Sequence, residues 1–380
     1  MKRLNVLILS DSFKGSLSSR DVANTVRDAL DQLNIGLFMD AMIVGDGGEG
    51  TSLALNKSGE ASQLTYNVYG AYGEQRTATC LVNQNKAFLD VAEVVGLPQI
   101  PVDQRRPLKS STKGLGEVLL HLSKEEEVDE IILSCGGSAT VDGGLGMLQS
   151  LGVIFKSFSG EILSDQAETL NKISDIEVRQ LNAIKPLTVL VDVGNPLLGD
   201  MGAAKCFGPQ KGASPEGVMT LEQGLNNFAV KTQAVFGPKI DSQSFGMGAA
   251  GGVPFACKYF LSADVQSGFD YFAKHLDLNS RIVKADLVIT GEGKVDQQSF
   301  MGKVVGKVAD LCKIEKTPLV VFCGINDLKK EQVEKTSVHK IESIIGGNSI
   351  ETMLSDKELT RNQLALTVRR VIPLILDELF

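Results

Sequence analysis

The chain has 380 residues, which is long for one hydrophobic core, so we expect two domains. Hydrophobic residues make up 43% of it and charged residues 22%, values typical of a globular protein. The formal net charge of −8 argues against a nucleic-acid partner, because binding to a phosphate backbone needs a basic face, but it does not exclude a small anionic substrate.

The first apolar run, Leu4–Leu9, predicts a buried strand. It ends at Ser10 and Asp11, so it is too short for a signal-peptide core or a membrane span. The six cysteines are scattered and never form a C-x-x-C pair, which favours free thiols in a reducing compartment over a zinc or redox site. We therefore expect a cytoplasmic protein that does not associate with a membrane.

A parallel sheet is predicted near the N-terminus. Capping residues at Ser18–Asp21 precede a helix that runs to about Leu33, and a second apolar strand follows at Leu37–Val44. The next loop, Asp46–Gly50, leads into a helix that ends near Asn56. This alternation of strand and helix implies parallel strands joined by right-handed crossovers.

The pattern changes near residue 62. Three short strands, at 64–69, 76–82 and 87–91, predict an antiparallel meander that begins a second domain. Apolar strands of the parallel type return further on, and helical periodicity marks the C-terminal stretch 363–379. These later strands are expected at 130–134, 187–191, 286–290 and 318–323.

We predict an α/β fold with a Rossmann-like parallel-sheet domain built from both chain ends, residues 1–62 and 281–380. A second, mixed α/β domain, residues 63–280, is inserted between them. The block 113–151 is compatible with either domain.

Five glycine-rich turns carry the candidate chemistry, and four of them directly follow an apolar, strand-like run. Glycine lets backbone amides approach an anion closely, and strand ends that lead into helices are natural phosphate sites. Acids at such turns can bind Mg²⁺ or accept a proton from a substrate hydroxyl. The pattern favours phosphoryl transfer onto a small molecule. The turns lie at 11–16, 46–51, 136–144, 192–196 and 291–296.

The loop Gly45–Gly50 also matches G-x-G-x-x-G after a strand, which is typical of dinucleotide binding. The match follows the second strand rather than the first, and its two acids would oppose a pyrophosphate. An NAD-dependent oxidoreductase therefore stays as an alternative function, beside a tight turn that simply needs glycine.

No Walker lysine motif is present, so Gly136–Thr140 is the best candidate for a phosphate loop. The alternative interpretation is an ordinary turn from strand to helix, capped by Asp142. Asp192 closes the apolar run 187–191, where ligand crevices form in α/β sheets. It could serve as a general base or a metal ligand, or it could be a turn residue. The lysine loop Phe207–Ala213 is a further candidate for contact with a nucleotide.

Several motifs together resemble the bacterial type-1 glycerate kinases, in the same order and from residue 4 to about residue 324. Val141 departs from this pattern, because the family usually has asparagine there. The motifs that carry the resemblance are Asp11–Ser18, Asp46–Thr51, Gly136–Thr140 with Asp142–Gly144, Phe207–Ala213 and Ile289–Gly293.

The resemblance implies ATP-dependent phosphorylation of glycerate with Mg²⁺, at a cleft between a Rossmann-like domain and an inserted α/β domain. As hypotheses, Asp192 and Lys14 are the catalytic residues, with Asp192 as the base. Substrate binding is assigned to Ser12, Lys14, Asp46 and Glu49. ATP binding is assigned to Gly136, Gly137, Ser138, Ala139, Thr140 and Lys211, and metal binding to Asp142, Glu292 and Asp296.

The residues leave several points open. The resemblance favours the 2-hydroxyl of glycerate as the phosphorylated group, in organic-acid catabolism, but another small sugar acid is an alternative substrate. Which acids bind Mg²⁺ and which acid is the base are not fixed by sequence order. The oligomeric state is also open, with a homodimer as one option.

Overall fold

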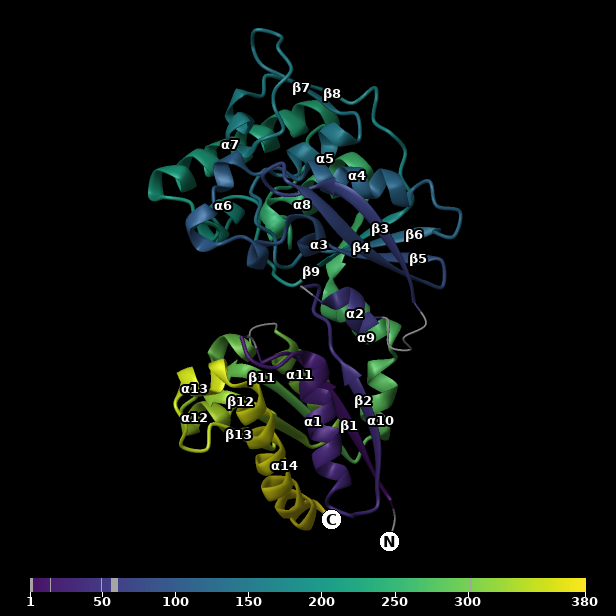
Figure 1. Ribbon diagram of the computed structural model, residues 1–380, viewed down its shortest axis with the longest axis vertical. Coiled ribbons are helices and arrows are strands. Elements are labelled where there is room, and N and C mark those ends of the chain that lie inside the picture. Colours follow the sequence, from purple (N-terminus) through teal and green to yellow (C-terminus); the bar gives the residue numbers. More distant parts are fainter. Residues whose placement is uncertain (1–2, 14, 49, 56–60, 301–302) are drawn as a thin grey trace. The chain divides into compact units, whose positions relative to one another are not determined.

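The computed structural model describes residues 3–13, 15–48, 50–55, 61–300 and 303–380. The chain divides into two compact units (Figure 1). Unit 1 comprises Met1–Gly45 and Phe272–Phe380, and unit 2 comprises Asp46–Tyr271. The sequence placed the borders near 62 and 280, where the residue pattern changes. The block 113–151 lies in unit 2, and so do the loop after Gly45 and the start of the connecting helix that contains Tyr271.

Unit 1 is built on a five-stranded parallel sheet in the order β13-β12-β11-β1-β2. Val6–Leu9 are almost fully buried in β1, as expected for a parallel strand that is covered on both faces. The fold-class prediction of a parallel α/β sheet is confirmed. The strands are β1 (Leu4–Ser10), β2 (Leu37–Ile43), β11 (Leu287–Val295), β12 (Leu319–Asn326) and β13 (Lys340–Ser343), the last of which the sequence did not reveal.

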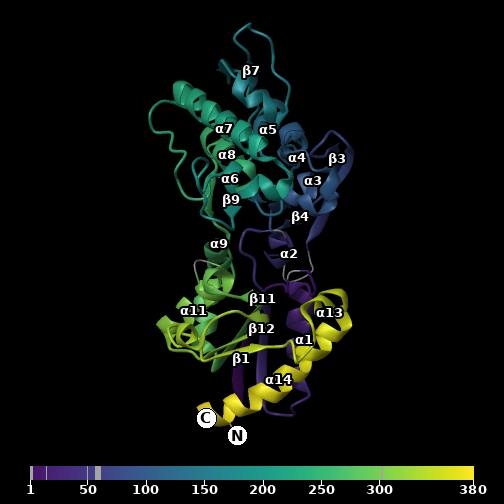
Figure 2. The same ribbon diagram turned by 90° about the vertical axis from the view of Figure 1, so that its left-hand side faces the viewer.

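Helices cover both faces of the unit 1 sheet. Helices α1 (Ser19–Asp31), α13 (Ile350–Ser355) and α14 (Lys357–Leu379) lie on one face, and α11 (Val304–Glu315) lies on the other (Figure 2). Helix α10 (Leu278–Lys284) packs beside α11, and α12 (Lys330–Val333) follows β12. The predicted capping residues do begin α1: Ser18 and Asp21 form a capping box, in which each side chain accepts a hydrogen bond from the other's backbone amide.

Unit 2 contains a six-stranded mixed sheet in the order β10-β9-β6-β5-β4-β3. The first three strands form the predicted antiparallel meander, and β5, β6, β9 and β10 are parallel to one another. The strands are β3 (Ser62–Tyr69), β4 (Gln75–Asn83), β5 (Lys86–Asp90), β6 (Glu130–Ser134), β9 (Leu187–Val191) and β10 (Asp264–Ser267); β7 (Ile154–Lys156) and β8 (Asp175–Glu177) form a separate antiparallel pair.

The helices of unit 2 pack around a core that is rich in phenylalanine. The ring of Phe228 contacts the rings of Phe155, Phe255 and Phe260, with centroid separations of 5.6–6.0 Å. The helices are α2 (Thr51–Leu55), α3 (Val91–Val95), α4 (Lys113–Leu122), α5 (Leu145–Ser150), α6 (Ala203–Phe207), α7 (Pro215–Phe236), α8 (Val253–Leu261) and α9 (Gly268–His275), and α9 crosses the division between the units.

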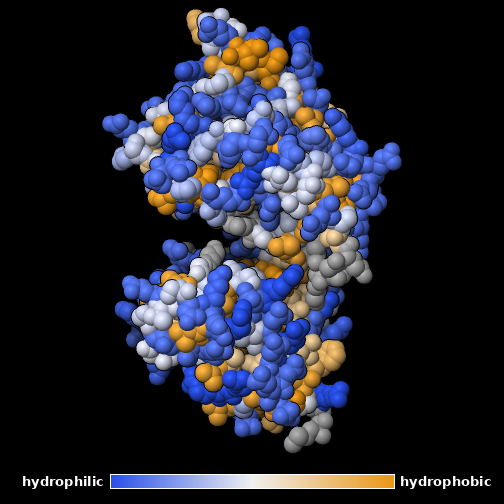
Figure 3. Space-filling view, in the orientation of Figure 1, coloured by the Kyte–Doolittle hydropathy of each residue, from blue (hydrophilic) through white to orange (hydrophobic). Residues whose placement is uncertain are grey.

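Hydrophilic residues predominate on the face shown in Figure 3, and hydrophobic ones gather there in small separate groups. Within the described part of the chain, no helix combines the length and the apolar character that spanning a bilayer would need.

Candidate active site

The four parallel strands of unit 2 end at one edge of their sheet. The register sets Asp90 at the end of β5 opposite Ser134 at the end of β6, and Val191 at the end of β9 opposite Ser267 of β10. In α/β sheets, ligands bind outside the carboxyl ends of the strands. Three of the predicted glycine-rich turns lie at this edge. The turns 136–144 and 192–196 follow β6 and β9, and the turn 46–51 packs on the end of β9. This edge is therefore the candidate site.

Lys211 meets the predicted phosphate loop here. Its Nζ donates hydrogen bonds to Ser138 Oγ at 2.9 Å and to the Thr140 carbonyl oxygen at 2.8 Å. The side chain is only 3% exposed, and burial lowers the pKa of Lys211 to about 7, although the carboxylates of Asp142 and Asp192 oppose this shift. Lys211 therefore lies beside Ser138 and Thr140, so two separate motifs assigned to ATP binding meet here.

The rest of the loop is held by the protein itself. The Ala139 amide donates to the Val95 carbonyl oxygen at 2.7 Å, so this amide is already used within the fold. Gly137 has a left-handed backbone, with φ of +70°, and is exposed. The hydroxyl of Thr140 is buried and has no hydrogen-bond partner among the described residues, which suits a ligand oxygen. Val141, which departs from the family pattern, is fully buried in the apolar core.

Asp142 lies in the interior of unit 2 and is 0% exposed. Its carboxylate accepts hydrogen bonds from Thr112 N at 2.8 Å, Thr112 Oγ1 at 2.7 Å, and the amides of Gly144 and Gly146 at 3.1 Å each. Burial raises the pKa of Asp142, and these donors counteract that shift. A carboxylate has about four lone-pair positions, so the protein already satisfies this group.

Asp46 and Asp192 approach the same glycine. A Cβ atom built on Gly48 would lie 2.8 Å from Asp46 Oδ1 and 3.3 Å from Asp192 Oδ2, so the two carboxylates flank this residue. The Gly48 amide donates to Asp46 Oδ1 at 2.9 Å, and Asp192 is exposed at the end of β9. The structure thus brings together the predicted base and one predicted substrate residue. Glu49 lies outside the described residues.

Asp90 is a buried carboxylate at the same sheet edge that sequence reasoning did not single out. It ends β5 and accepts hydrogen bonds from the amides of Gly50 and Ser52 and from Ser52 Oγ, at 2.9, 3.2 and 2.6 Å. The available signal was the one that identified Asp192, a carboxylate that closes an apolar strand. The strand predicted at 87–91 contains Asp90, so the sequence pattern does not place this carboxylate at a strand end.

A second group of predicted residues lies in unit 1. Ser12 follows β1, but the prediction of a turn at 291–296 is wrong, because residues 291–295 continue strand β11 and pair with β12. Counted in chain order, the strands of this sheet follow the order 2-1-3-4-5, whose switch point falls between β1 and β11. Ser10 pairs with Gly291 there, and a Cβ atom on Gly291 would lie 3.2 Å from the Phe13 ring. The loop that carries Ser12 is therefore next to the part of β11 that carries Glu292. Lys14 lies outside the described residues.

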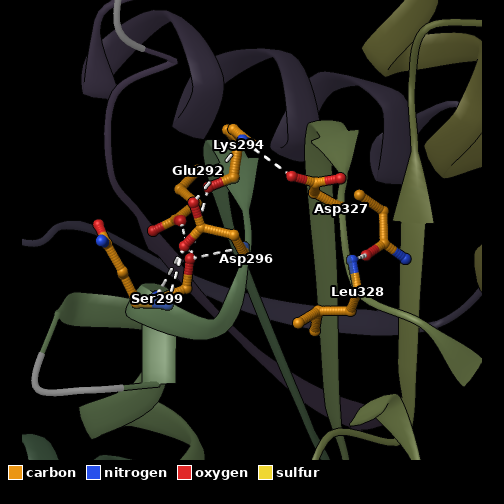
Figure 4. Close-up of polar contacts among 8 residues, drawn as sticks. Glu292, Lys294, Asp296, Ser299, Asp327 and Leu328 are labelled. Carbon is orange, nitrogen blue, oxygen red and sulfur yellow. Dashed lines mark hydrogen bonds and ion pairs between the residues drawn. The ribbon is translucent and has the colours of Figure 1, made fainter. Parts of the chain in front are cut away.

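Ser299 joins the two predicted metal ligands of unit 1 (Figure 4). Its hydroxyl donates to Glu292 Oε1, and its amide donates to Asp296 Oδ1 at 3.2 Å. Lys294 lies beside them and pairs with Asp327, with 2.9 Å between Nζ and Oδ2. Asp327 was not anticipated from the sequence.

The three acids assigned to metal binding belong to different units of the fold. Asp142 belongs to unit 2, whereas Glu292 and Asp296 belong to unit 1. Among the described residues, no group of three or more His, Cys, Asp or Glu side chains has a metal-binding arrangement.

Comparison with known proteins agrees with these motifs. The model of the glycerate kinase family matches residues 6–375. An uncharacterised protein of Synechocystis is 37% identical over 96% of each chain, and the glycerate 2-kinase of Escherichia coli is 34% identical over 84% of this chain and 85% of its own. A crystal structure described as glycerate kinase 2 of Salmonella typhimurium LT2 has a TM-score of 0.80 and 30% identity, and the match covers 99% of both chains. The chain therefore belongs to the glycerate kinase family.

Proposed function

We propose that this protein is a kinase that transfers a phosphoryl group from ATP to glycerate. The observation that carries the proposal is the contact of Lys211 with Ser138 and Thr140 at the same sheet edge as Asp46 and Asp192. A buried cation beside small hydroxyl residues suits a phosphate, and a nearby carboxylate suits a hydroxyl that must lose its proton. Membership of the glycerate kinase family supports ATP as the donor and glycerate as the acceptor.

The oxidoreductase alternative is not favoured. The G-x-G-x-x-G match at Gly45–Gly50 crosses the division between the units. It also follows β2, whereas the dinucleotide fingerprint lies in the first strand-to-helix turn of its sheet. The family matches also point to a kinase.

ATP phosphates are assigned to Gly136, Gly137, Ser138, Thr140 and Lys211. The unpartnered Thr140 hydroxyl and the Lys211 amine fit such a group, because both would gain an oxygen partner. Ala139 contributes by shaping the loop rather than through its amide, which is taken by the Val95 carbonyl.

Asp192 is assigned as the base that accepts the proton of the attacked hydroxyl, because it is exposed at a strand end and lies near Asp46. Ser12 and Lys14 are proposed to bind the carboxylate of glycerate, for which a lysine supplies the charge. Asp46 and Glu49 are proposed to contact its hydroxyl groups.

Mg²⁺ is assigned to Glu292 and Asp296. The ion usually takes one or two carboxylates and completes its shell with water and substrate phosphates, and these two side chains, which share Ser299, fit that donor set. The chemistry that Mg²⁺ supplies in phosphoryl transfer is neutralisation of phosphate charge. We propose that Asp142 is a structural anchor instead, because four protein donors occupy its carboxylate.

We propose phosphorylation at the 2-hydroxyl, in organic-acid catabolism, in line with the name of the Escherichia coli relative. A cytoplasmic location is proposed because all six cysteines are free thiols.

An assay of ADP release from ATP with a panel of hydroxy acids tests the proposal. Glycerate should give the highest kcat/KM, and phosphorus NMR of the product should show 2-phosphoglycerate. Turnover with a different sugar acid only, or a change in nicotinamide absorbance without ADP, would overturn it.

A further inference from the structure

The loop Asp46–Ser52 crosses the carboxyl edge of the unit 2 sheet from one strand to another. Near its start, Gly47 packs so tightly on Val191 of β9 that an added Cβ atom would lie 2.8 Å from the Val191 carbonyl carbon. At its other end, Gly50 and Ser52 bind Asp90 of β5. Because β6 lies between β9 and β5, the loop passes over the strand from which the phosphate loop starts.

The first half of this loop is held by packing: Gly47 lies against Val191 and also against Gly268, where an added Cβ atom would lie 2.2 Å from the Gly47 nitrogen. Its hydrogen bonds among the described residues are short-range. The Gly48 amide bonds Asp46 Oδ1, and the Gly47 amide bonds Thr51 Oγ1 at 3.1 Å. Both bonds close turns within the loop and fix nothing to the sheet. The bonds from Gly50 and Ser52 to Asp90, 40 and 38 positions away, are what connect its second half to a strand.

The carboxylate of Asp90 accepts hydrogen bonds from the loop through both of its oxygens. It is 7% exposed, and each carboxylate oxygen accepts from the loop: Oδ2 from the Gly50 amide, and Oδ1 from the amide and hydroxyl of Ser52. Ser134 of the neighbouring strand β6 is a further hydrogen-bond donor to it. An asparagine would keep the shape, but its NH₂ group would face an N–H donor, so it cannot replace both acceptors.

We propose that Asp90 is a positioning residue for the glycerate kinase reaction, which holds the Asp46–Ser52 loop in place so that Asp46 stays beside Asp192. Asp90 acts through the loop and does not itself contact the substrate. The inference rests on the proposed function, since that function gives the loop its role in binding glycerate.

The test uses the full-length protein with Asp90→Asn and Ser52→Ala. Asp165→Asn is the control, because Asp165 is a half-buried carboxylate of unit 2 that accepts from Ser111 Oγ at 3.1 Å and has no hydrogen bond to the loop among the described residues. In Asp90→Asn, the KM for glycerate should rise about tenfold or more while the KM for ATP stays within about twofold, as expected for loss of a hydrogen bond to a charged group. Ser52→Ala keeps the charge and removes one donor, so it should give a smaller change of the same kind.

Amide hydrogen exchange without substrate provides a second readout. The peptide that spans residues 46–55 should exchange faster in Asp90→Asn, and exchange in the core strand β6 should be unchanged. Unchanged amide-exchange protection of residues 46–55 would show that Asp90 does not hold the loop and would overturn the proposal. Faster exchange with an unchanged glycerate KM would also overturn the proposal, because a loosened loop would then have no part in substrate binding.

Failure of the proposed function is distinguishable from failure of this inference. If wild-type protein does not phosphorylate glycerate, the proposed function fails, and the kinetic comparison is made with the hydroxy acid that the panel identifies. If Asp90→Asn does not fold, Ser52→Ala decides, since it removes only a hydroxyl. If neither the amide exchange of residues 46–55 nor the KM for glycerate then changes in Ser52→Ala, the positioning role of Asp90 is overturned.

Discussion

The amine of Lys211 lies 2.9 Å from Ser138 Oγ, although 73 positions separate the two residues in the chain. No ion pair to this amine is found among the described residues within 4 Å, and its neighbours are a hydroxyl and a carbonyl oxygen. An isolated buried cation is costly to the fold unless a ligand compensates for it. An arriving phosphate would supply the missing negative charge, which is the role proposed for Lys211.

Replacement of Lys211 by methionine should weaken ATP binding by about tenfold or more, because a charge-assisted contact to phosphate is lost. Titration calorimetry at several pH values measures this. Because the pKa of Lys211 lies at about 7, wild-type affinity should fall as pH rises from about 6 to about 8.5, and the variant should lack this component. Lys205→Met, at an exposed lysine paired with Asp200, is the control and should behave as wild type. Equal ATP affinity in Lys211→Met would remove this residue from the phosphate site.

The same substitution should change how stability depends on pH. The pKa of Lys211 is about 7 in the folded protein and about 10.5 when unperturbed, so between these values the unfolded chain binds more protons. The free energy of unfolding therefore rises with pH across this window, and the penalty of the buried charge is fully present below about pH 7. Urea denaturation between about pH 7 and 8.5 should show a shallower rise in Lys211→Met than in wild type. Parallel curves would mean that the amine is not perturbed by burial.

Asp192→Asn should reduce kcat by about 10²–10⁴ while both substrates still bind, because an amide cannot accept a proton. Steady-state kinetics and calorimetry together separate turnover from binding. If Asp192 is the base, raising Mg²⁺ will not restore activity, whereas partial rescue would identify a metal ligand. Asp200→Asn, at an exposed carboxylate later in the same loop region, serves as the control. Retention of more than about a tenth of wild-type kcat would reduce Asp192 to a turn residue.

Asp142→Asn should lower the free energy of unfolding by about 3 kcal/mol, because the amide leaves buried N–H donors of α4 and α5 without an acceptor. Thr112→Val, which removes the hydroxyl that donates to Asp142 and accepts from the Met147 amide at 3.0 Å, should cost about 2 kcal/mol. Denaturation curves measure both effects. The Mg²⁺ concentration for half-maximal activity should be unchanged in the folded fraction, and a large increase there would restore Asp142 as a metal ligand.

Glu292→Gln should raise the Mg²⁺ concentration required for half-maximal activity, since a neutral amide is a poorer ligand for a hard cation. The effect should appear in a Mg²⁺ titration at saturating ATP and glycerate. Asp327→Asn tests the specificity of the effect, because Asp327 follows β12 and pairs with Lys294 of β11 but is not assigned to the ion. An equal shift in both variants would point to general electrostatics of this loop cluster.

The sequence by itself determined the local elements and the family. The strand β1, the capping box at Ser18 and Asp21 and the antiparallel meander β3–β5 were all predictable, because each depends on periodicity or capping within a few residues. The glycine-rich motifs identified the kinase family for the same reason, since each is a short contiguous pattern. The roles of Lys14 and Glu49, which lie outside the described residues, stay predictions.

Only the tertiary structure decided which predicted site residues lie together and what surrounds each of them. Sequence spacing did not show that Lys211 would reach Ser138, or that Asp90 would hold Gly50 across 40 positions. Asp142 and Asp192 both follow strands of one sheet, yet one faces the interior and is satisfied by four protein donors, while the other is exposed. The physical reason is that the environment of a carboxylate is set by the elements that pack around it. Those elements come from distant parts of the chain, which local patterns do not encode.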